Sequence, residues 1–335
     1  MEQVRRMSAP QISVVVPMYN AAPFIDRTLT SIRAQSISEL EIIVVDDGST
    51  DVSPALVARH AQADTRIRLV TIPNGGVAAA RNHGASLASA PYIAFVDADD
   101  LWTVDKLKKQ LSLFRKGSAR LGLVYCWFAR IDADDMIMGY DASSIADGDV
   151  VDAICSRNLI GNGSSVLVRR DMFLQSGGFD PELRARAAEG CEDYDFYARM
   201  AGMCDFGLVR EFSVGYRITD TNMSSNLARM ARSRLICARR LLDRYPDRGR
   251  AIRHGRRRFM RYSLRRALVQ RNWKQSWRLM LMMLGTEPFL HVIEMPGILI
   301  RARQTAKLRQ AEEPVSPIRF KIGTTFPHSQ DQEAL

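Results

Sequence analysis

Four short runs within residues 11–110 constrain the fold of this chain more than any other feature. Each run holds five or six residues rich in β-branched and aromatic side chains, which are typical of strands. Between them lie segments with the apolar spacing of helices. The runs are 12–16, 40–45, 67–72 and 92–96, and the helical segments are 22–35, 53–62 and 77–88. Near-continuous apolar strands that alternate with helices favour an α/β fold, in which a mostly parallel sheet carries helices on both faces.

Carboxylates directly follow two of the expected strands. Asp46 and Asp47 end the second strand, and Asp97 and Asp99 end the fourth. In parallel sheets of this kind, ligands bind beyond the carboxyl ends of the strands. Carboxylates at that edge can hold a hard divalent cation, and the cation can hold a diphosphate.

The Asp97/Asp99 spacing is a weak signal by itself, since the 25 Asp residues form an Asp-x-Asp pattern four times. Its position at a strand end distinguishes this pair from the others. The pair Asp132/Asp134 follows an expected strand at 121–131 and has the composition of a hairpin turn. The two remaining pairs are Asp147/Asp149 and Asp193/Asp195.

The formal net charge of +10 conceals an asymmetry between two parts of the chain. Residues 226–310 hold 22 Lys and Arg against 4 acidic residues, and their apolar residues repeat with helical spacing. This basic helical extension is either solvated or lies on an anionic membrane surface, to which Trp273 and Trp277 are suited. No nucleic-acid motif accompanies the charge, so nucleic acid is not expected as a partner.

The composition also indicates the cellular compartment and the limits of the domains. The most apolar stretch, 279–300, contains two Glu and two Pro, which argues against a membrane-spanning helix. The first ten residues lack the apolar core of a secretory signal, and the five Cys have no metal-binding spacing. We therefore expect a cytoplasmic protein with reduced thiols. Its parts are an N-terminal tail 1–10, a sheet domain 11–225, the extension 226–310 and a loose tail 311–335.

Five short segments carry a more specific pattern, at residues 14–20, 44–51, 74–84, 95–100 and 189–199. They contain, in turn, Pro-Met-Tyr-Asn, Asp-Asp-Gly-Ser, Asn-Gly-Gly, Asp-Ala-Asp-Asp and Glu-Asp-Tyr-Asp. Together and in this order they resemble family-2 inverting glycosyltransferases of the GT-A fold, over roughly residues 11–220. The resemblance implies a GT-A-type sheet domain that binds a nucleotide-sugar donor.

The resemblance assigns the donor-binding residues. Asp47 is expected to accept the N3–H of a uracil or thymine ring, with Pro17 and Asn20 lining the base and ribose pocket. The Asn-Gly-Gly segment opens the helix that carries Arg81, and its glycines allow close approach of the backbone to a ligand. Arg81 would bind phosphate or the neighbouring carboxylates.

A metal site follows from the same resemblance. Asp99 is expected to hold Mn²⁺ or Mg²⁺ between the two phosphates, and Asp97 to contact the ribose or the metal. Arg217 belongs to a segment that resembles the one folding over the diphosphate, although Ile218 stands where the family often has a His.

Inversion at the anomeric carbon requires a base on the acceptor side. Asp193 matches that base, and its neighbours Glu192 and Asp195 have no assigned part. Acidic residues at a helix start can also have a purely structural role, because their negative charge interacts favourably with the positive end of the helix dipole. We expect Asp100 to cap a helix that begins near Trp102, and not to bind metal.

The sequence thus predicts a metal-dependent inverting glycosyltransferase that uses a UDP- or dTDP-sugar and a hydroxyl acceptor. The acceptor would be a lipid-linked saccharide at the inner face of a membrane, as in surface polysaccharide or glycolipid assembly. Two alternatives remain open. A nucleotidyltransferase would need a glycine-rich triphosphate loop near the N-terminus, which residues 17–23 do not supply. A non-catalytic, membrane-associated nucleotide-binding scaffold is the other.

Overall fold

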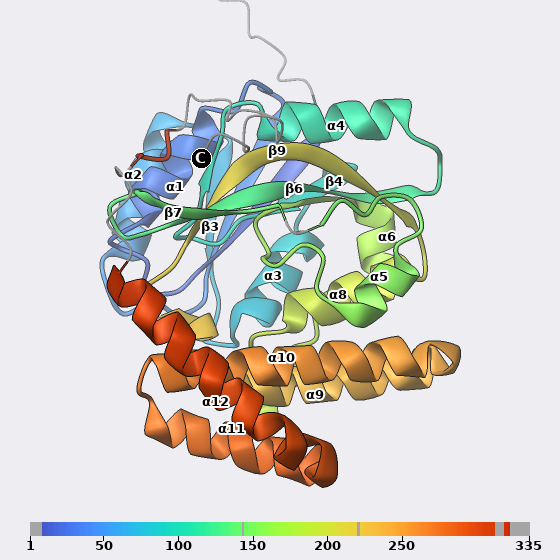
Figure 1. The fold of residues 1–335 in the computed structure, drawn as a ribbon. Coiled ribbons are helices and arrows are strands. Elements are labelled where there is room, and N and C mark those ends of the chain that lie inside the picture. Colours follow the sequence, from blue (N-terminus) through green and yellow to red (C-terminus); the bar gives the residue numbers. More distant parts are fainter. Residues whose placement is uncertain (1–8, 143, 220–221, 312–317, 322–335) are drawn as a thin grey trace, which may run out of the picture.

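The computed structural model describes residues 9–142, 144–219, 222–311 and 318–321, and Figure 1 shows how they are arranged. A central sheet carries helices on both faces, and a group of four long helices lies beside it (Figure 1). This arrangement confirms the predicted α/β fold with a C-terminal helical extension.

The first half of the sheet is parallel. Every residue of its central strand is buried, as expected for a strand covered on both faces. The strands are β1 (Ile12–Met18), β2 (Leu40–Asp46), β3 (Ile67–Thr71) and β4 (Tyr92–Phe95), with β1 between β2 and β4. The connecting helices are α1 (Ile25–Arg33), α2 (Ser53–Ala63) and α3 (Val77–Ser86). All seven elements match the predicted ones to within a few residues.

The second half of the sheet is mixed. Beyond β4 come β8 (Val166–Arg169), β6 (Leu121–Ile131), β9 (Asp205–Arg217) and the edge strand β5 (Leu101–Trp102), while β7 (Ile137–Asp141) forms a hairpin with β6. Only β6 and β9 pair in parallel here. Asp132 lies in the β6–β7 turn, where its Oδ1 accepts hydrogen bonds from the backbone of Asp134 and Met136, both at 2.9 Å. The turn predicted for this Asp-x-Asp pair is confirmed.

Hydrophobic clusters fill both sides of the sheet. One contains Leu29 of α1, Val57 of α2 and Leu111 of the next helix, and the other contains Ala80 of α3 and Phe196. The remaining helices of the sheet domain are α4 (Lys106–Lys116), α5 (Val151–Ser156), α6 (Arg170–Gln175), α7 (Glu182–Ala185) and α8 (Glu192–Ala201). Figure 1 shows α4 on the opposite side of the sheet from α3 and α8.

The basic extension consists of α9 (Leu227–Arg244), α10 (Gly249–Val269), α11 (Trp273–Thr286) and α12 (Pro288–Ala311). It packs on the sheet domain instead of standing apart from it. Leu241 of α9 and Ile252 of α10 belong to the same buried cluster as α3 and α8. Arg240 forms ion pairs with Asp180 at 2.6 Å and Asp195 at 3.0 Å. The predicted boundary at 225/226 therefore separates the sheet from the helices but does not divide the hydrophobic core.

Two details differ from the expectations. No helix begins near Trp102, because Leu101 and Trp102 form the edge strand β5, so Asp100 has no helix there to cap. Within the predicted tail, residues 318–321 lie against the β6–β7 hairpin. There Phe320 is buried against Leu101 and Ile131. The rest of the predicted tails falls mostly outside the described residues.

All five Cys are buried and unpaired, in agreement with reduced thiols. Over the described part of the chain, no helix combines the length and apolarity needed to cross a bilayer.

The contact between α5 and α10 depends on a glycine, and this gives a stability prediction. A Cβ at Gly255 would lie 2.0 Å from the carbonyl oxygen of Ser156, so Gly255→Ala must push α10 away from α5. We expect a loss of about 1–3 kcal/mol in the free energy of unfolding, measured by denaturant titration.

Gly285→Ala in α11 is the matched control, because nothing lies within 4 Å of its Cβ position. It should leave stability unchanged or raise it by up to about 1 kcal/mol, since Ala has a better helix propensity than Gly. Equal stability of the two variants would contradict the close α5–α10 contact.

Candidate active site

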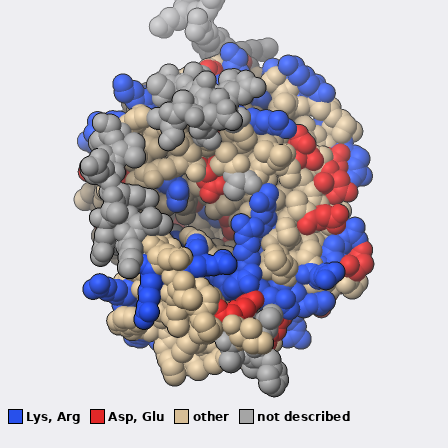
Figure 2. Space-filling view, in the orientation of Figure 1, with Lys and Arg blue, Asp and Glu red and all other residues tan. Residues whose placement is uncertain are grey.

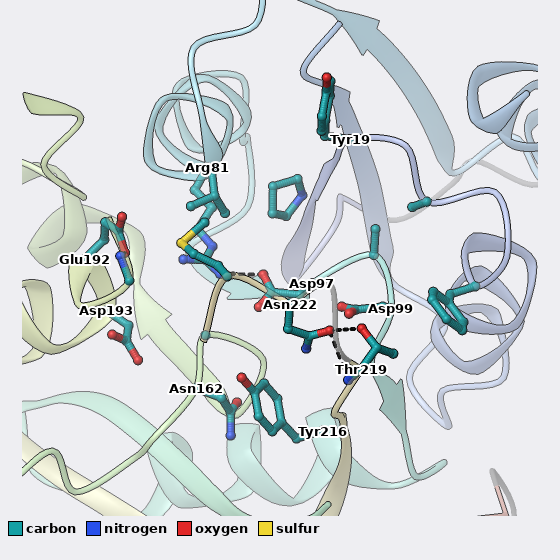
Figure 3. Close-up of a pocket in the computed structure, with 18 of the residues that line it drawn as sticks. Tyr19, Arg81, Asp97, Asp99, Asn162, Glu192, Asp193, Tyr216, Thr219 and Asn222 are labelled. Carbon is teal, nitrogen blue, oxygen red and sulfur yellow. Dashed lines mark hydrogen bonds and ion pairs between the residues drawn. The ribbon is translucent and has the colours of Figure 1, made fainter. Parts of the chain in front are cut away.

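The carboxyl ends of β1 and β4 meet at one edge of the sheet because these strands are parallel neighbours. A cavity of about 560 Å³ opens there, and Figure 3 shows the side chains around it. The starts of α3 and α8, the end of β9 and the first turns of α9 complete its walls. Of the eight predicted site residues, six line this cavity: Pro17, Asn20, Arg81, Asp97, Asp99 and Asp193.

Arg81 and Asp97 form a partly buried ion pair in the wall of the cavity. Arg81 extends from α3, its side chain is 6% exposed, and its Nη2 donates to Asp97 Oδ1. Its guanidinium group also lies 5.1 Å from the centre of the Phe179 ring. Gly163 allows this position, since a Cβ there would lie 2.5 Å from Arg81 Nη2. Arg81 thus holds one carboxylate of the Asp-x-Asp pair while its own Nε is buried without an acceptor among the described residues.

Asp99 faces the same cavity from the loop after β4 (Figure 3). Burial raises the pKa of its carboxyl group to about 6, and the nearby negative charge of Asp97 adds to the increase. Two adjacent carboxylates in a buried wall repel each other, and a bound cation would relieve that repulsion. Among the described residues no group of three or more His, Cys, Asp or Glu forms a complete metal cage. A metal here would therefore need ligands from a bound molecule or from water.

Asp100 and Arg217 have a structural position behind the cavity. Asp100 accepts hydrogen bonds from Ser164 Oγ and, at 2.8 Å, from the backbone nitrogen of Arg217. The side chain of Arg217 is fully buried, and it donates to the backbone oxygens of Asp99 and Asp132 and to the carboxylate of Asp135.

This placement does not support the donor-binding role predicted for Arg217, because its guanidinium group is buried and bound to protein acceptors. The capping role predicted for Asp100 is wrong. Its carboxylate instead joins the ends of β4 and β9, and burial raises its pKa well above the ordinary value.

Asp47 lies in a smaller adjoining cavity of about 300 Å³, which shares Pro17 and Tyr19 with the larger one. Its carboxylate accepts hydrogen bonds from the backbone nitrogens of Gly75 at 2.6 Å and Gly76 at 2.8 Å. Gly76 has a φ of +89°, which favours glycine and turns the loop into α3. The Asn-Gly-Gly segment therefore fixes the orientation of Asp47, in addition to opening the helix of Arg81.

Asn20 fixes the loop that follows β1. It has a φ of +48°, a conformation that Asn tolerates better than most residues. Its backbone nitrogen donates to Ser49 Oγ at 2.9 Å, and its Oδ1 accepts from the backbone of Thr50 at 2.8 Å. The loops after β1 and β2 are thereby joined at the edge of the cavity.

Asp193 lies across the cavity from Asp99, at the start of α8 (Figure 3). It accepts hydrogen bonds from Asn158 Nδ2 at 3.3 Å and from the backbone of Tyr194 at 2.7 Å. Burial raises the pKa of the Asp193 carboxyl group, and it raises that of the neighbouring Glu192 to about 7. Asp195 does not line this cavity, because its carboxylate pairs with Arg199 and Arg240.

Several lining residues were not identified from the sequence. Asn222 comes from the loop after β9, and Met230 comes from α9. The Cβ position of Gly190 lies 2.2 Å from Met230 Sδ, so only a glycine allows α9 to approach the start of α8 this closely. No local pattern indicates that the basic extension contributes to the cavity, because the contact joins segments about forty residues apart in the chain.

Part of this chain is similar in sequence to known proteins. Residues 13–173 match the sequence model of glycosyl transferase family 2. The uncharacterized glycosyltransferase EpsJ of Bacillus subtilis is 38% identical over 125 residues, which cover 37% of this chain and 36% of EpsJ. The putative teichuronic acid biosynthesis glycosyltransferase TuaG of the same organism is 41% identical over 110 residues, or 32% of this chain and 44% of TuaG. The matched segments thus span less than half of either relative.

Solved structures resemble this chain over a greater length. Residues 1–349 of S. aureus TarS, in complex with UDP-GlcNAc, align with a TM-score of 0.62 at 15% identity, covering 95% of this chain and 99% of that one. The mannosyltransferase PcManGT of Pyrobaculum calidifontis, in complex with GDP-Man and Mn²⁺, aligns with a TM-score of 0.60 at 18% identity, covering 90% and 85%. At these identities the likeness concerns the fold, which is of the GT-A type. Residues 13–173, which lie within the sheet domain and make up just under half of the chain, are therefore similar to glycosyl transferase family 2.

Proposed function

We propose that this chain transfers a sugar from a UDP- or dTDP-linked donor to a hydroxyl acceptor, with inversion at the anomeric carbon and with a divalent cation. One observation carries the proposal: Asp97 and Asp99 lie on one wall of a cavity, and Asp193 lies on the opposite wall (Figure 3). An in-line displacement needs this opposition of a leaving-group site and a base.

The donor would span the two adjoining cavities. The base ring would enter the smaller cavity, which Asp47 lines. Two backbone N–H groups orient the Asp47 carboxylate, and its oxygens can each accept a further hydrogen bond, such as one from the N3–H of a pyrimidine. Pro17 lies between the two cavities and Asn20 borders the larger one, where the ribose would lie. Arg81 would hold the Asp97 carboxylate in place and add positive charge beside the diphosphate.

The carboxylates of Asp97 and Asp99 fit Mn²⁺ or Mg²⁺, since both are hard oxygen ligands that line one cavity. When bound, the cation supplies Lewis-acid stabilisation of the charge that develops on the nucleoside diphosphate. The Mn²⁺ in the structure of PcManGT supports this part of the proposal by analogy of fold.

Asp193 would act as the general base. As the acceptor oxygen bonds to the anomeric carbon, its proton passes to the Asp193 carboxylate, and the bond from that carbon to the diphosphate oxygen breaks. Asn158 and the start of α8 hold the carboxylate in place, while burial raises its pKa toward the range useful for proton transfer.

The acceptor would be a saccharide assembled at the inner face of a membrane, where the basic extension attaches the enzyme peripherally. On α11, Trp273, Trp277 and Leu281 are 68%, 59% and 51% exposed and lie four residues apart, so they share one face. Lys274 and Arg278 are exposed beside them. An apolar stripe with flanking cations fits an anionic bilayer surface.

The first functional prediction concerns the metal. Asp99→Asn should abolish Mn²⁺-dependent binding of a UDP-sugar, measured by calorimetric titration with and without Mn²⁺, because an amide is a poorer ligand for a hard cation. Asp134→Asn makes the same chemical change at an exposed position of the β6–β7 turn and should bind donor normally. Mn²⁺-stimulated donor binding that persists in Asp99→Asn would remove this residue from the metal site.

The second concerns the base. Asp193→Asn should leave donor affinity nearly unchanged and lower turnover by a factor on the order of 10² or more. Because only the ionised carboxylate accepts a proton, turnover of the unsubstituted enzyme should fall as the pH drops through the raised pKa of Asp193. The midpoint of that fall should lie above the ordinary Asp value of about 3.9.

Glu192→Gln shows which of the neighbouring acids Glu192 and Asp193 causes the fall in turnover, since the pKa of Glu192 is also raised. The fall in turnover should persist in that variant. If Glu192→Gln abolished it, or if Asp193→Asn lost donor affinity with normal transfer from bound donor, Asp193 would not be the base.

The third concerns the membrane surface. The full chain should sediment with phosphatidylglycerol vesicles at low salt and be released as salt rises, because each basic residue near the surface contributes about 1 kcal/mol that salt screens. Replacing Trp273 and Trp277 together by Ser should weaken this binding by about tenfold or more.

Val52→Ser removes an exposed apolar side chain from the sheet domain and should have no effect. Equal binding to phosphatidylcholine vesicles would contradict the electrostatic account, and absence of binding to both would remove the membrane role.

A further inference from the structure

A third cavity, of about 350 Å³, continues from the candidate active site toward the basic extension. Both cavities are lined by Gly161, Gly190, Asp193 and Met230, so the carboxylate of the proposed base is accessible from either. The far wall of the third cavity is built from α9 and α10 and from the segment that follows α5. We call it the arginine cavity, after Arg157, Arg234 and Arg258, which line it.

The three guanidinium groups, of Arg157 after α5 and of Arg234 and Arg258 in the extension, differ from several in the extension that form ion pairs. Arg240, Arg256 and Arg261 each pair with a carboxylate. Within the described parts of the chain, the guanidinium groups of Arg157, Arg234 and Arg258 form no ion pair with a carboxylate. Three cations and the single carboxylate of Asp193 line this cavity, so its lining has an excess of positive charge.

Arg234 is the most deeply buried of the three arginines in this wall. It is 4% exposed, and its guanidinium carbon lies 3.7 Å from the centre of the Tyr194 ring and 5.9 Å from that of Phe259. Stacking on the rings restrains the plane of the guanidinium group. Its Nε is buried and has no hydrogen-bond acceptor in the part of the chain that the structure describes. Such a buried, unsatisfied donor is costly unless a ligand supplies an acceptor.

Aromatic side chains lie next to these charges. Phe259 is half-buried and Tyr262 is 47% exposed, and both come from α10 on the face that borders the cavity. Aromatic rings pack well against the apolar faces of other rings, while the hydroxyl of Tyr262 offers a polar contact. The wall therefore combines features suited to a ring-shaped ligand that also carries negative charge. Figure 2 shows a hollow near the middle of one face, with Lys and Arg around and below it and with Asp or Glu also at its edge.

We propose that the arginine cavity binds the acceptor, and that this acceptor is a saccharide bearing an anionic group, either a phosphate or a carboxylate. The inference rests on the proposed glycosyl transfer and adds the chemical class of the acceptor. The anionic group binds the forked N–H groups of Arg157, Arg234 and Arg258, which suit phosphate and carboxylate oxygens. The sugar ring packs near Phe259 and Tyr262, and its hydroxyl group reaches Asp193.

Binding of simple glycosides tests this inference. The full chain is saturated with UDP and Mn²⁺, so that an added anion cannot occupy the donor site. Methyl glucoside 6-phosphate, methyl glucuronoside and neutral methyl glucoside are then titrated separately. At least one anionic glycoside should bind on the order of tenfold more tightly than the neutral one, because charge-assisted hydrogen bonds are worth about a factor of ten each. The tighter of the two identifies phosphate or carboxylate as the preferred group.

Arg157→Gln combined with Arg258→Gln should abolish the preference for the anionic glycoside. The matched control is Arg250→Gln combined with Arg253→Gln, which removes two charges from exposed positions of α10 outside the cavity. The control should retain the preference. Equal affinity of the unsubstituted chain for charged and neutral glycosides would overturn the inference, and so would equal weakening in both double variants, which would indicate only the general field of the extension.

The measurement distinguishes this inference from the proposed function on which it rests. Failure of the unsubstituted chain to bind UDP with Mn²⁺ would count against the proposed function. Normal UDP binding without any preference for the anionic glycosides would overturn the acceptor class alone.

Discussion

The buried contact between Asp100 and the end of β9 holds the candidate site together. Asp100 follows directly on the Asp-x-Asp pair, and its carboxylate accepts the backbone N–H of Arg217 and the hydroxyl of Ser164. In addition, Nε of Arg217 donates a hydrogen bond to the backbone oxygen of Asp99 at 2.7 Å. Because these groups are buried, losing one partner would leave another unsatisfied at a cost of about 1–3 kcal/mol. The loop that carries the proposed metal ligands is thus fixed from behind.

The carboxylates of the Asp-x-Asp loop repel one another, and neighbouring cations offset part of this repulsion. Asp99 and Asp100 are adjacent in the chain, and burial together with the negative charge of Asp97 disfavours the ionised forms of Asp99 and Asp100. Arg81 pairs with Asp97, and Arg217 binds behind the loop, but Asp99 receives no such cation in the described residues. The unbalanced charge faces the cavity, where a divalent cation and a diphosphate would balance it.

The helical extension belongs to the same functional unit as the sheet. Met230 of α9 reaches the start of α8 through the space left by Gly190, and Arg240 anchors α9 to Asp195. Helices α9 and α10 form a wall of the cavity beside Asp193. The neighbouring helix α11 exposes Trp273 and Trp277 to solvent. The extension thus has one side available to a substrate and another available to a surface.

The sequence by itself determined the parallel half of the sheet and the position of its carboxylates. β1, β2 and β4 are buried on both faces, so their apolar runs mark them locally, and a side chain just beyond such a strand must lie at the sheet edge. Asp46, Asp47, Asp97 and Asp99 could therefore be placed at one edge of the sheet before any coordinates, whereas Pro17 and Asn20 were assigned from the resemblance to a family. The assignment of Asp193 came from the resemblance to a family and not from local pattern, since acidic residues also begin ordinary helices.

Only the tertiary structure decided what the remaining charged residues do. Arg217 and Arg81 have the same chemistry in the sequence, yet one is buried behind the site and the other lines it, because β9 and α3 approach the Asp-x-Asp loop from different sides. Asp100 joins two strands and does not cap a helix, since the residues after it pair with β9. Likewise, the basic extension approaches Asp193 through contacts between segments far apart in the chain. Such contacts leave no periodic signal, because they depend on how complete helices and strands pack and not on neighbouring residues.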